Sequence, residues 1–130
     1  MNYNDFLTRQ QQIKKLSIAE QKNFYEQYDK TEVRILASFY YGQLFYQEGN
    51  FRKTIEIIEP IIVDYQSYPY TPKLLSCFNL IGVATHCETE YNVSRFFYET
   101  ALKIAMENDC DILHIAFSSG LSGSYSSTKI

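Results

Sequence analysis

A helix-turn-helix pattern that occurs twice along the chain constrains the fold more than any other feature of the sequence. Residues 35–51 contain Gly42 within an apolar helical pattern that ends at Gly49, and residues 75–91 repeat the pattern around Gly82. Further positions agree at the same offset: Glu48 with Glu88, Phe51 with Tyr91, Thr54 with Ser94, Ile58 with Tyr98, and Ile62 with Leu102. Because such a unit is too short to bury its own apolar face, the repetition predicts stacked helical hairpins.

A glycine inside a helix costs about 1 kcal/mol relative to alanine, and this cost is offset when a neighbouring helix packs against the bare backbone. Gly42 and Gly82 therefore indicate two close helix crossings. Both lie where the tetratricopeptide repeat, which this pattern resembles, has a small residue. The other matching positions are Tyr41 and Ile81 before the glycines, Phe78 in the first helix and Ala101 late in the second. The resemblance implies an all-α, right-handed solenoid of antiparallel helical hairpins.

The chain departs from the tetratricopeptide pattern at several points. Thr54 and Ser94 replace the usual alanine, Thr89 replaces the inter-helix glycine, and the closing proline is absent. The offset from Gly42 to Gly82 also exceeds the usual period of about 34 residues. We expect the surplus to form a longer inter-repeat loop at residues 65–72.

The apolar periodicity predicts helices over residues 2–28 (two helices), 32–48, 51 onward, 73–87 and 91–107. Ser17 and Glu20 have the spacing of a capping box, which predicts a helix that starts at Ile18. Pro60 removes a backbone donor inside the fourth helix, so a kink or an early end is expected near Glu59. A helical-repeat domain over residues 1–109 follows from this pattern.

Composition narrows the classes of function. A net charge of −3 and a pI near 5.3 disfavour nucleic-acid binding, which requires a basic face. No apolar run approaches the roughly 20 residues of a membrane span. Residues 1–10 lack the apolar segment of a secretory signal, so the expected location is the cytoplasm. Three cysteines, an odd number, suit reduced thiols better than a disulfide framework.

Few residues suggest chemistry. His86 and Cys87 are adjacent, so on a helix they point about 100° apart and are poorly placed to share a metal. Cys110 and His114 have helical spacing, but two ligands fall short of the usual three or four. Glu88 and Glu90 have no neighbouring base and fit a solvated turn better than an acid and base pair. We therefore expect no catalytic residue, no metal and no cofactor.

Residues 110–130 form a tail with a different pattern. Residues 112–117 are apolar enough for a short strand, and residues 118–125 resemble the Ser- and Gly-rich loop of the DegV family of bacterial fatty-acid-binding proteins. That resemblance implies an alternative function, in which Ser118, Ser119, Ser122 and Gly123 hold a fatty-acid carboxylate. The other interpretation is a passive tail, since no further strands accompany this segment.

The repeat pattern favours a protein-interaction module. In such repeats the inner face of the first helices holds a peptide or another helix, and that face would carry Phe39, Gln43, Tyr46, Gln47, Ser76, Asn79, Val83 and His86. The alternative is that these side chains only cover the core, or that the repeats self-associate. Residues 39–53 and 77–91 also resemble the N-terminal repeats of some Firmicute GGDEF-type diguanylate cyclases. This resemblance implies a fragment of a bacterial signalling protein.

Overall fold

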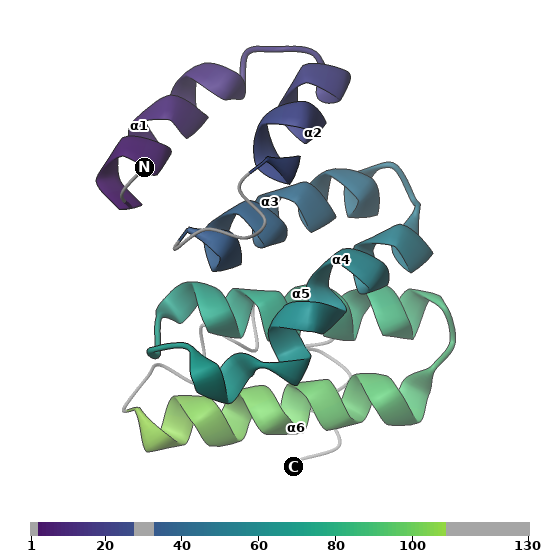
Figure 1. Cartoon of the computed structure of the whole chain (residues 1–130). Coiled ribbons are helices and arrows are strands. Elements are labelled where there is room, and N and C mark those ends of the chain that lie inside the picture. Colours follow the sequence, from purple (N-terminus) through teal and green to yellow (C-terminus); the bar gives the residue numbers. More distant parts are fainter. Residues whose placement is uncertain (1–2, 28–32, 109–130) are drawn as a thin grey trace.

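The computed structural model describes residues 3–27 and 33–108, and within these ranges the chain is all-α, as predicted (Figure 1). The elements in chain order are α1 (Tyr3–Ile13), α2 (Ile18–Glu26), α3 (Arg34–Gln47), α4 (Phe51–Val63), the short 3-10 helix η1 (Tyr65–Ser67), α5 (Pro72–Cys87) and α6 (Tyr91–Glu107). No strand occurs among the described residues.

The helices lie in succession from α1 at one end to α6 at the other, so that each packs on its neighbours in the chain (Figure 1). α3 and α4 form one helix pair, and α5 and α6 form a second. α5 packs against both helices of the first pair, and α2 packs on α3. The two segments that share a sequence pattern are therefore two consecutive helix pairs.

The turns inside the two pairs have the same hydrogen bonds. Gly49 and Thr89, at matching positions of the repeat, both have a positive φ, +82° and +63° respectively. The amide after Gly49 donates to the Phe45 carbonyl, and the amide after Thr89 donates to the Thr85 carbonyl, each over 2.9 Å. Both turns are thus Schellman motifs, which end a helix by a left-handed residue. Thr89 takes this conformation although its side chain is β-branched.

Thr54 and Ser94, which depart from the tetratricopeptide pattern, make equivalent buried hydrogen bonds. The Thr54 hydroxyl donates to the Gly42 carbonyl over 2.9 Å, and the Ser94 hydroxyl donates to the Gly82 carbonyl over 2.8 Å. Each bond joins the two helices of one pair. The hydroxyls therefore add a polar link at the same point where the glycines allow close approach.

The two glycines face different side chains. A Cβ at Gly42 would lie 3.1 Å from the Ile58 side chain, whereas a Cβ at Gly82 would lie 2.9 Å from Cζ of Tyr98. Both glycines are buried. The close helix crossings indicated by the sequence are thus present in both pairs, with Ile58 and Tyr98 at matching positions.

Helix starts follow the local sequence. α2 begins at Ile18, as predicted, where the Ser17 hydroxyl accepts a hydrogen bond from the Glu20 amide over 3.3 Å and donates to its carboxylate over 2.8 Å. α4 begins after Asn50, whose side chain accepts from the Lys53 amide over 3.3 Å. Such caps satisfy amides that the first helical turn leaves unpaired.

Near Glu59 a kink or an early end of α4 was expected, and the early end is wrong. The helix continues through Pro60 to Val63. Proline cannot donate to the carbonyl four residues earlier, that of Glu56, but both residues lie on the exposed face of α4, where water can supply the missing bond. Ile58 and Ile61 on the opposite face are fully buried, and this packing keeps the segment helical.

Two clusters of buried side chains form the core. The larger is built around α4, α5 and α6 and includes Ile58, Phe78 and Ile81, each fully buried. The smaller joins α1, α2 and α3 around Phe6, which is also fully buried and lies 5.7 Å from the Phe24 ring centroid. The expected longer loop at residues 65–72 contains η1, and Tyr65, Tyr68 and Tyr70 pack from it onto the larger cluster.

Cys77 belongs to the larger cluster and has no exposed surface. Its thiol lies 3.8 Å from the Ile35 carbonyl oxygen, which connects α5 to α3. Burial raises the pKa of this thiol to about 12, because the charged thiolate would lose its hydration. Cys77 and Cys87 are both free thiols.

Several predictions fall outside the described residues. These are the boundary at residues 109 and 110, the strand at residues 112–117 and the Ser- and Gly-rich loop with Ser118, Ser119, Ser122 and Gly123.

Candidate functional site

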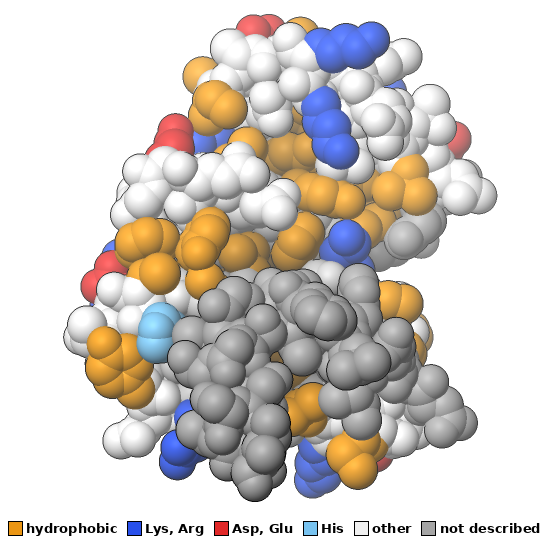
Figure 2. Space-filling model, turned by 180° about the vertical axis from the view of Figure 1, so that it is seen from behind, with side chains coloured by type: hydrophobic (Ala, Val, Ile, Leu, Met, Phe, Trp, Pro, Cys, Tyr) orange, Lys and Arg blue, Asp and Glu red, His pale blue; other side chains and the backbone are white. Residues whose placement is uncertain are grey.

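The candidate groove residues lie on α3 and α5, the first helices of the two pairs. Seen from behind, hydrophobic side chains gather in a band across the middle of the molecule, at the height of α3 (Figure 2). Phe39, Tyr40, Tyr41 and Tyr46 of α3 are all half-buried. This helix therefore offers partly exposed aromatic surface in addition to the side chains that it buries.

A lysine from α5 lies over the aromatic side chains of α3. Lys73 Nζ is 4.7 Å from the Phe39 ring centroid and 5.1 Å from that of Tyr40. The two rings are in edge contact, with centroids 5.3 Å apart. A cation over a ring face is attracted by the ring quadrupole, at about 0.5–1 kcal/mol in exposed sites. Phe39 is thus held between the two helix pairs, and part of its ring remains exposed.

Tyr46 and His86 occupy equivalent positions and make equivalent contacts. The Tyr46 ring lies 5.3 Å from Phe51 with an interplanar angle of 58°, and the His86 ring lies 5.0 Å from Tyr91 at the same angle. Burial and the neighbouring Cys87 thiol raise the pKa of the Tyr46 hydroxyl, so it stays protonated and able to donate a hydrogen bond. These contacts bring the last turn of each first helix against the start of its second helix.

The remaining candidate residues differ in exposure. Gln47 is exposed, and Gln43 and Val83 are half-buried. Asn79 is only 5% exposed, so it contributes at most a small edge to this face. Phe39, Tyr46 and His86 are each partly exposed on two helices that pack against one another, whereas Asn79 belongs mainly to the packed interior.

Ion pairs connect the turn of each helix pair to an earlier helix, which is α2 for the first pair and α4 for the second. Lys22 of α2 lies 2.7 Å from the Glu48 carboxylate, and Arg52 of α4 lies 3.4 Å from Glu88 and 3.2 Å from Glu90. Glu48 and Glu88 are at matching repeat positions. Exposed pairs of this kind contribute little stability, at most about 1 kcal/mol each. Glu88 and Glu90 are therefore turn residues that bind an arginine, in agreement with the prediction of a solvated turn.

An apolar hollow that the sequence did not predict lies between the end of α4 and α6, the two helices in front in Figure 1. It has a volume of about 500 Å³, and its apolar lining includes Ile62, Val63, Tyr65, Phe78, Phe96 and Phe97. We call it the α4–α6 cleft. A signal for it was present in the sequence, because Phe96 stands where the first pair has Glu56.

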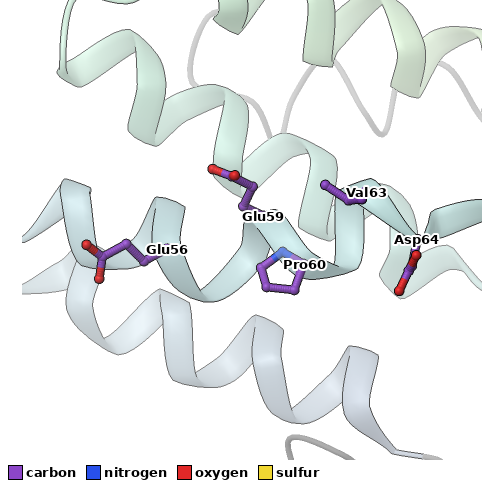
Figure 3. A pocket seen from close by; sticks show the side chains of 5 residues that line it. All are labelled: Glu56, Glu59, Pro60, Val63 and Asp64. Atoms are coloured by element: carbon purple, nitrogen blue, oxygen red, sulfur yellow. The ribbon is translucent and has the colours of Figure 1, made fainter.

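The exposed side of α4 carries three carboxylates beside a shallow hollow of about 480 Å³. Figure 3 shows that the carboxylates of Glu56, Glu59 and Asp64 point in different directions along the helix and do not converge. Within residues 3–27 and 33–108, no group of three His, Cys, Asp or Glu side chains could hold a metal ion. In the same part of the chain, no helix combines the length and apolarity needed to cross a membrane.

Comparison of the chain with protein-family models, with curated proteins and with solved structures finds no match.

Proposed function

We propose that this chain is a non-catalytic, cytoplasmic helical-repeat module that binds a peptide or a helix of another protein on the face of α3 and α5. The fold would be a right-handed solenoid of antiparallel hairpins, similar to tetratricopeptide repeats. The resemblance to the repeats of diguanylate cyclases suggests a bacterial signalling protein as the context.

One observation carries this proposal: the two helix pairs repeat the same internal contacts at the same offset in sequence. The hydroxyl bonds to Gly42 and Gly82, the two Schellman turns and the Tyr46–Phe51 and His86–Tyr91 contacts all recur. Repetition of this kind sets successive first helices side by side, and their shared face is the surface on which repeat proteins bind partners. Here that face offers aromatic rings and the side-chain amides of Gln43 and Gln47, groups suited to an extended chain.

Capture from a bacterial lysate tests the proposal when it is combined with substitutions on the two sides of the molecule. The groove variants are Gln47→Arg and His86→Ala, at an exposed and a half-buried position of the α3–α5 face. The matched control is Glu56→Ala, on the exposed side of α4. We expect a protein captured by the unmodified chain to be lost with the groove variants and retained with the control.

Equal capture by all three variants would contradict binding on the α3–α5 face. In that case Phe39, Tyr46 and His86 would serve only to cover the core. Circular dichroism of each variant checks that the helical content is unchanged, so that a loss of capture reports on the surface and not on folding.

The fatty-acid alternative rests on Ser118, Ser119, Ser122 and Gly123, which lie outside the described residues. No observation among residues 3–27 and 33–108 favours it, and the interaction module is therefore the function we propose.

A further inference from the structure

The α4–α6 cleft exposes more apolar surface than the matching side of the first pair. Phe96 is 61% exposed and Val63 is 74% exposed, and they lie on opposite walls of the cleft. The position that matches Phe96 in the first pair is Glu56, which is also exposed. The fold therefore accepts a carboxylate at this site, and the phenylalanine is not needed to complete the core.

The inner end of the cleft is also apolar. Its floor includes Phe78, which is fully buried, with the Tyr65 ring in edge contact at 5.4 Å. Phe96 and Phe97 have ring centroids 5.9 Å apart on the α6 wall. An apolar hollow with exposed aromatic rings at its rim is typical of protein contact surfaces.

Two opposite charges flank this apolar surface. Glu59 belongs to the α4 wall and Lys103 to the α6 wall. Neither forms an ion pair with another residue in the described part of the chain. A surface with complementary charges would place a cation opposite Glu59 and an anion opposite Lys103.

We propose that the partner of the α4–α6 cleft is the same cleft of a second copy, in a twofold symmetric dimer. The twofold rotation about an axis through the cleft sets Lys103 of the second copy opposite Glu59 and Glu59 of the second copy opposite Lys103. The Phe96 rings and Val63 side chains meet between these two charge pairs. Such a self-complementary patch is the basis of isologous dimers, the most common oligomers of soluble proteins. The surface lies on another side of the molecule from the α3–α5 face, so the dimer leaves the proposed groove open.

Sedimentation of the full chain over a range of concentrations tests the dimer. The unmodified protein is expected to shift from monomer to dimer as concentration rises. Phe96→Glu, which introduces the residue type of the first pair, should weaken the dimer by about tenfold or more, as expected for an aromatic residue at the centre of an interface. Val63→Ser provides a second test on the opposite wall. The matched control is Met106→Glu, an apolar residue of α6 that is 66% exposed outside the cleft, and it should leave dimerisation within about twofold.

Charge exchange tests the symmetry. Glu59→Lys alone and Lys103→Glu alone each place like charges opposite one another twice in the dimer, so each should weaken self-association by about tenfold. An equimolar mixture of the two variants should form a dimer again, because every contact between unlike copies then pairs opposite charges. The double variant should also dimerise.

A chain that stays monomeric at the highest attainable concentration would overturn the proposal, as would a dimer that Phe96→Glu does not weaken. A dimer that fails to recover in the mixture would overturn the twofold arrangement. The groove variant Gln47→Arg should leave the dimer unchanged, so this proposal and the proposed peptide binding fail or succeed separately.

Discussion

The two helix pairs, α3–α4 and α5–α6, have the same backbone contacts and different side chains. Both have a mid-helix glycine whose carbonyl accepts a hydroxyl hydrogen bond, and both end the first helix with a left-handed residue. Yet Gly42 faces Ile58 where Gly82 faces Tyr98, and the turn residue is Gly49 in one and Thr89 in the other. The comparison shows that the two helix pairs share their backbone contacts, while the side chains around those contacts differ.

The side chains that differ also determine which substitutions and which pH destabilise each pair. In the second pair, the rigid Tyr98 ring lies at the helix crossing, and the core contains an ionisable thiol, Cys77. The matching positions of the first pair are Ile58 and Ala37, which have no ionisable group. Substitutions and pH should therefore affect the two pairs unequally, and this inequality can be measured.

The largest expected effect comes from filling the second crossing. Gly82→Leu should destabilise the fold by about 3 kcal/mol or more, because even a Cβ would lie 2.9 Å from the Tyr98 ring and a larger side chain must force α5 and α6 apart. Thermal unfolding followed by circular dichroism measures the loss. An unchanged melting temperature would show that Gly82 is not at a close crossing.

A smaller substitution at both glycines serves as the control for this comparison. Gly42→Ala should be nearly neutral, since the flexible Ile58 side chain can move and alanine gains about 1 kcal/mol of helix propensity. Gly82→Ala should cost about 1–2 kcal/mol against the rigid ring. In a Tyr98→Leu background, that cost should largely disappear.

Alkaline pH is expected to destabilise the second pair. The folded Cys77 thiol keeps its proton to about pH 12, whereas the unfolded thiol releases it near its ordinary pKa of 9.0. The unfolded state thus binds fewer protons between these values, and stability should be constant below pH 9 and fall by about 1.4 kcal/mol for each pH unit above it. Burial raises the pKa of Tyr98 as well, with the same sign.

Cys77→Ala, which introduces the residue of the first pair at that position, should reduce this slope. Denaturant unfolding at pH 8, 9, 10 and 11 compares the two proteins, and Cys87→Ala, at an exposed thiol, is the control. Equal slopes for all three would mean that Cys77 ionises in the folded state as easily as in the unfolded chain.

The hydroxyl bonds should matter more in the first pair. Thr54→Val removes a buried donor from the Gly42 carbonyl and should cost about 1 kcal/mol. Ser94→Ala should cost less, because the Thr85 hydroxyl also donates to the Gly82 carbonyl, over 3.0 Å. Double-mutant cycles with the adjacent glycines would refine the comparison. A larger cost for Ser94→Ala than for Thr54→Val would show that the Thr85 hydroxyl does not compensate at the Gly82 carbonyl.

The smallest expected effect concerns the turns. Thr89→Gly should stabilise the fold by about 0.5 kcal/mol, because glycine adopts a φ of +63° without steric cost, although the hydroxyl bond to the Glu88 carbonyl is lost. The reverse change, Gly49→Thr, should destabilise by about 1 kcal/mol. Effects of the same sign at both turns would indicate that φ does not control their stability.

Local features of the sequence determined the helix ends and the repeat. Ser17, Asn50 and Pro72 mark starts because a cap or a missing donor suits the unpaired amides of a first turn, and Gly49 marks an end because its φ is positive. These preferences act within a few residues, so they can be recognised from the sequence without the tertiary structure. The repeat likewise required only a comparison of positions along the chain.

Features that depend on residues far apart in the sequence were decided only by the tertiary structure. Pro60 remains inside α4 because burial of the apolar face of that helix stabilises it by more than one lost hydrogen bond costs. The local sequence does not indicate which of these two effects is larger. The helical spacing predicted that Asn79 lies on the groove face, but packing buries nearly all of this residue. The α4–α6 cleft exists only because two helices that the whole of α5 separates in sequence line the same hollow from two sides. Burial and cavities are properties of the assembled helices, because they depend on which surfaces face one another and not on the preference of any one segment.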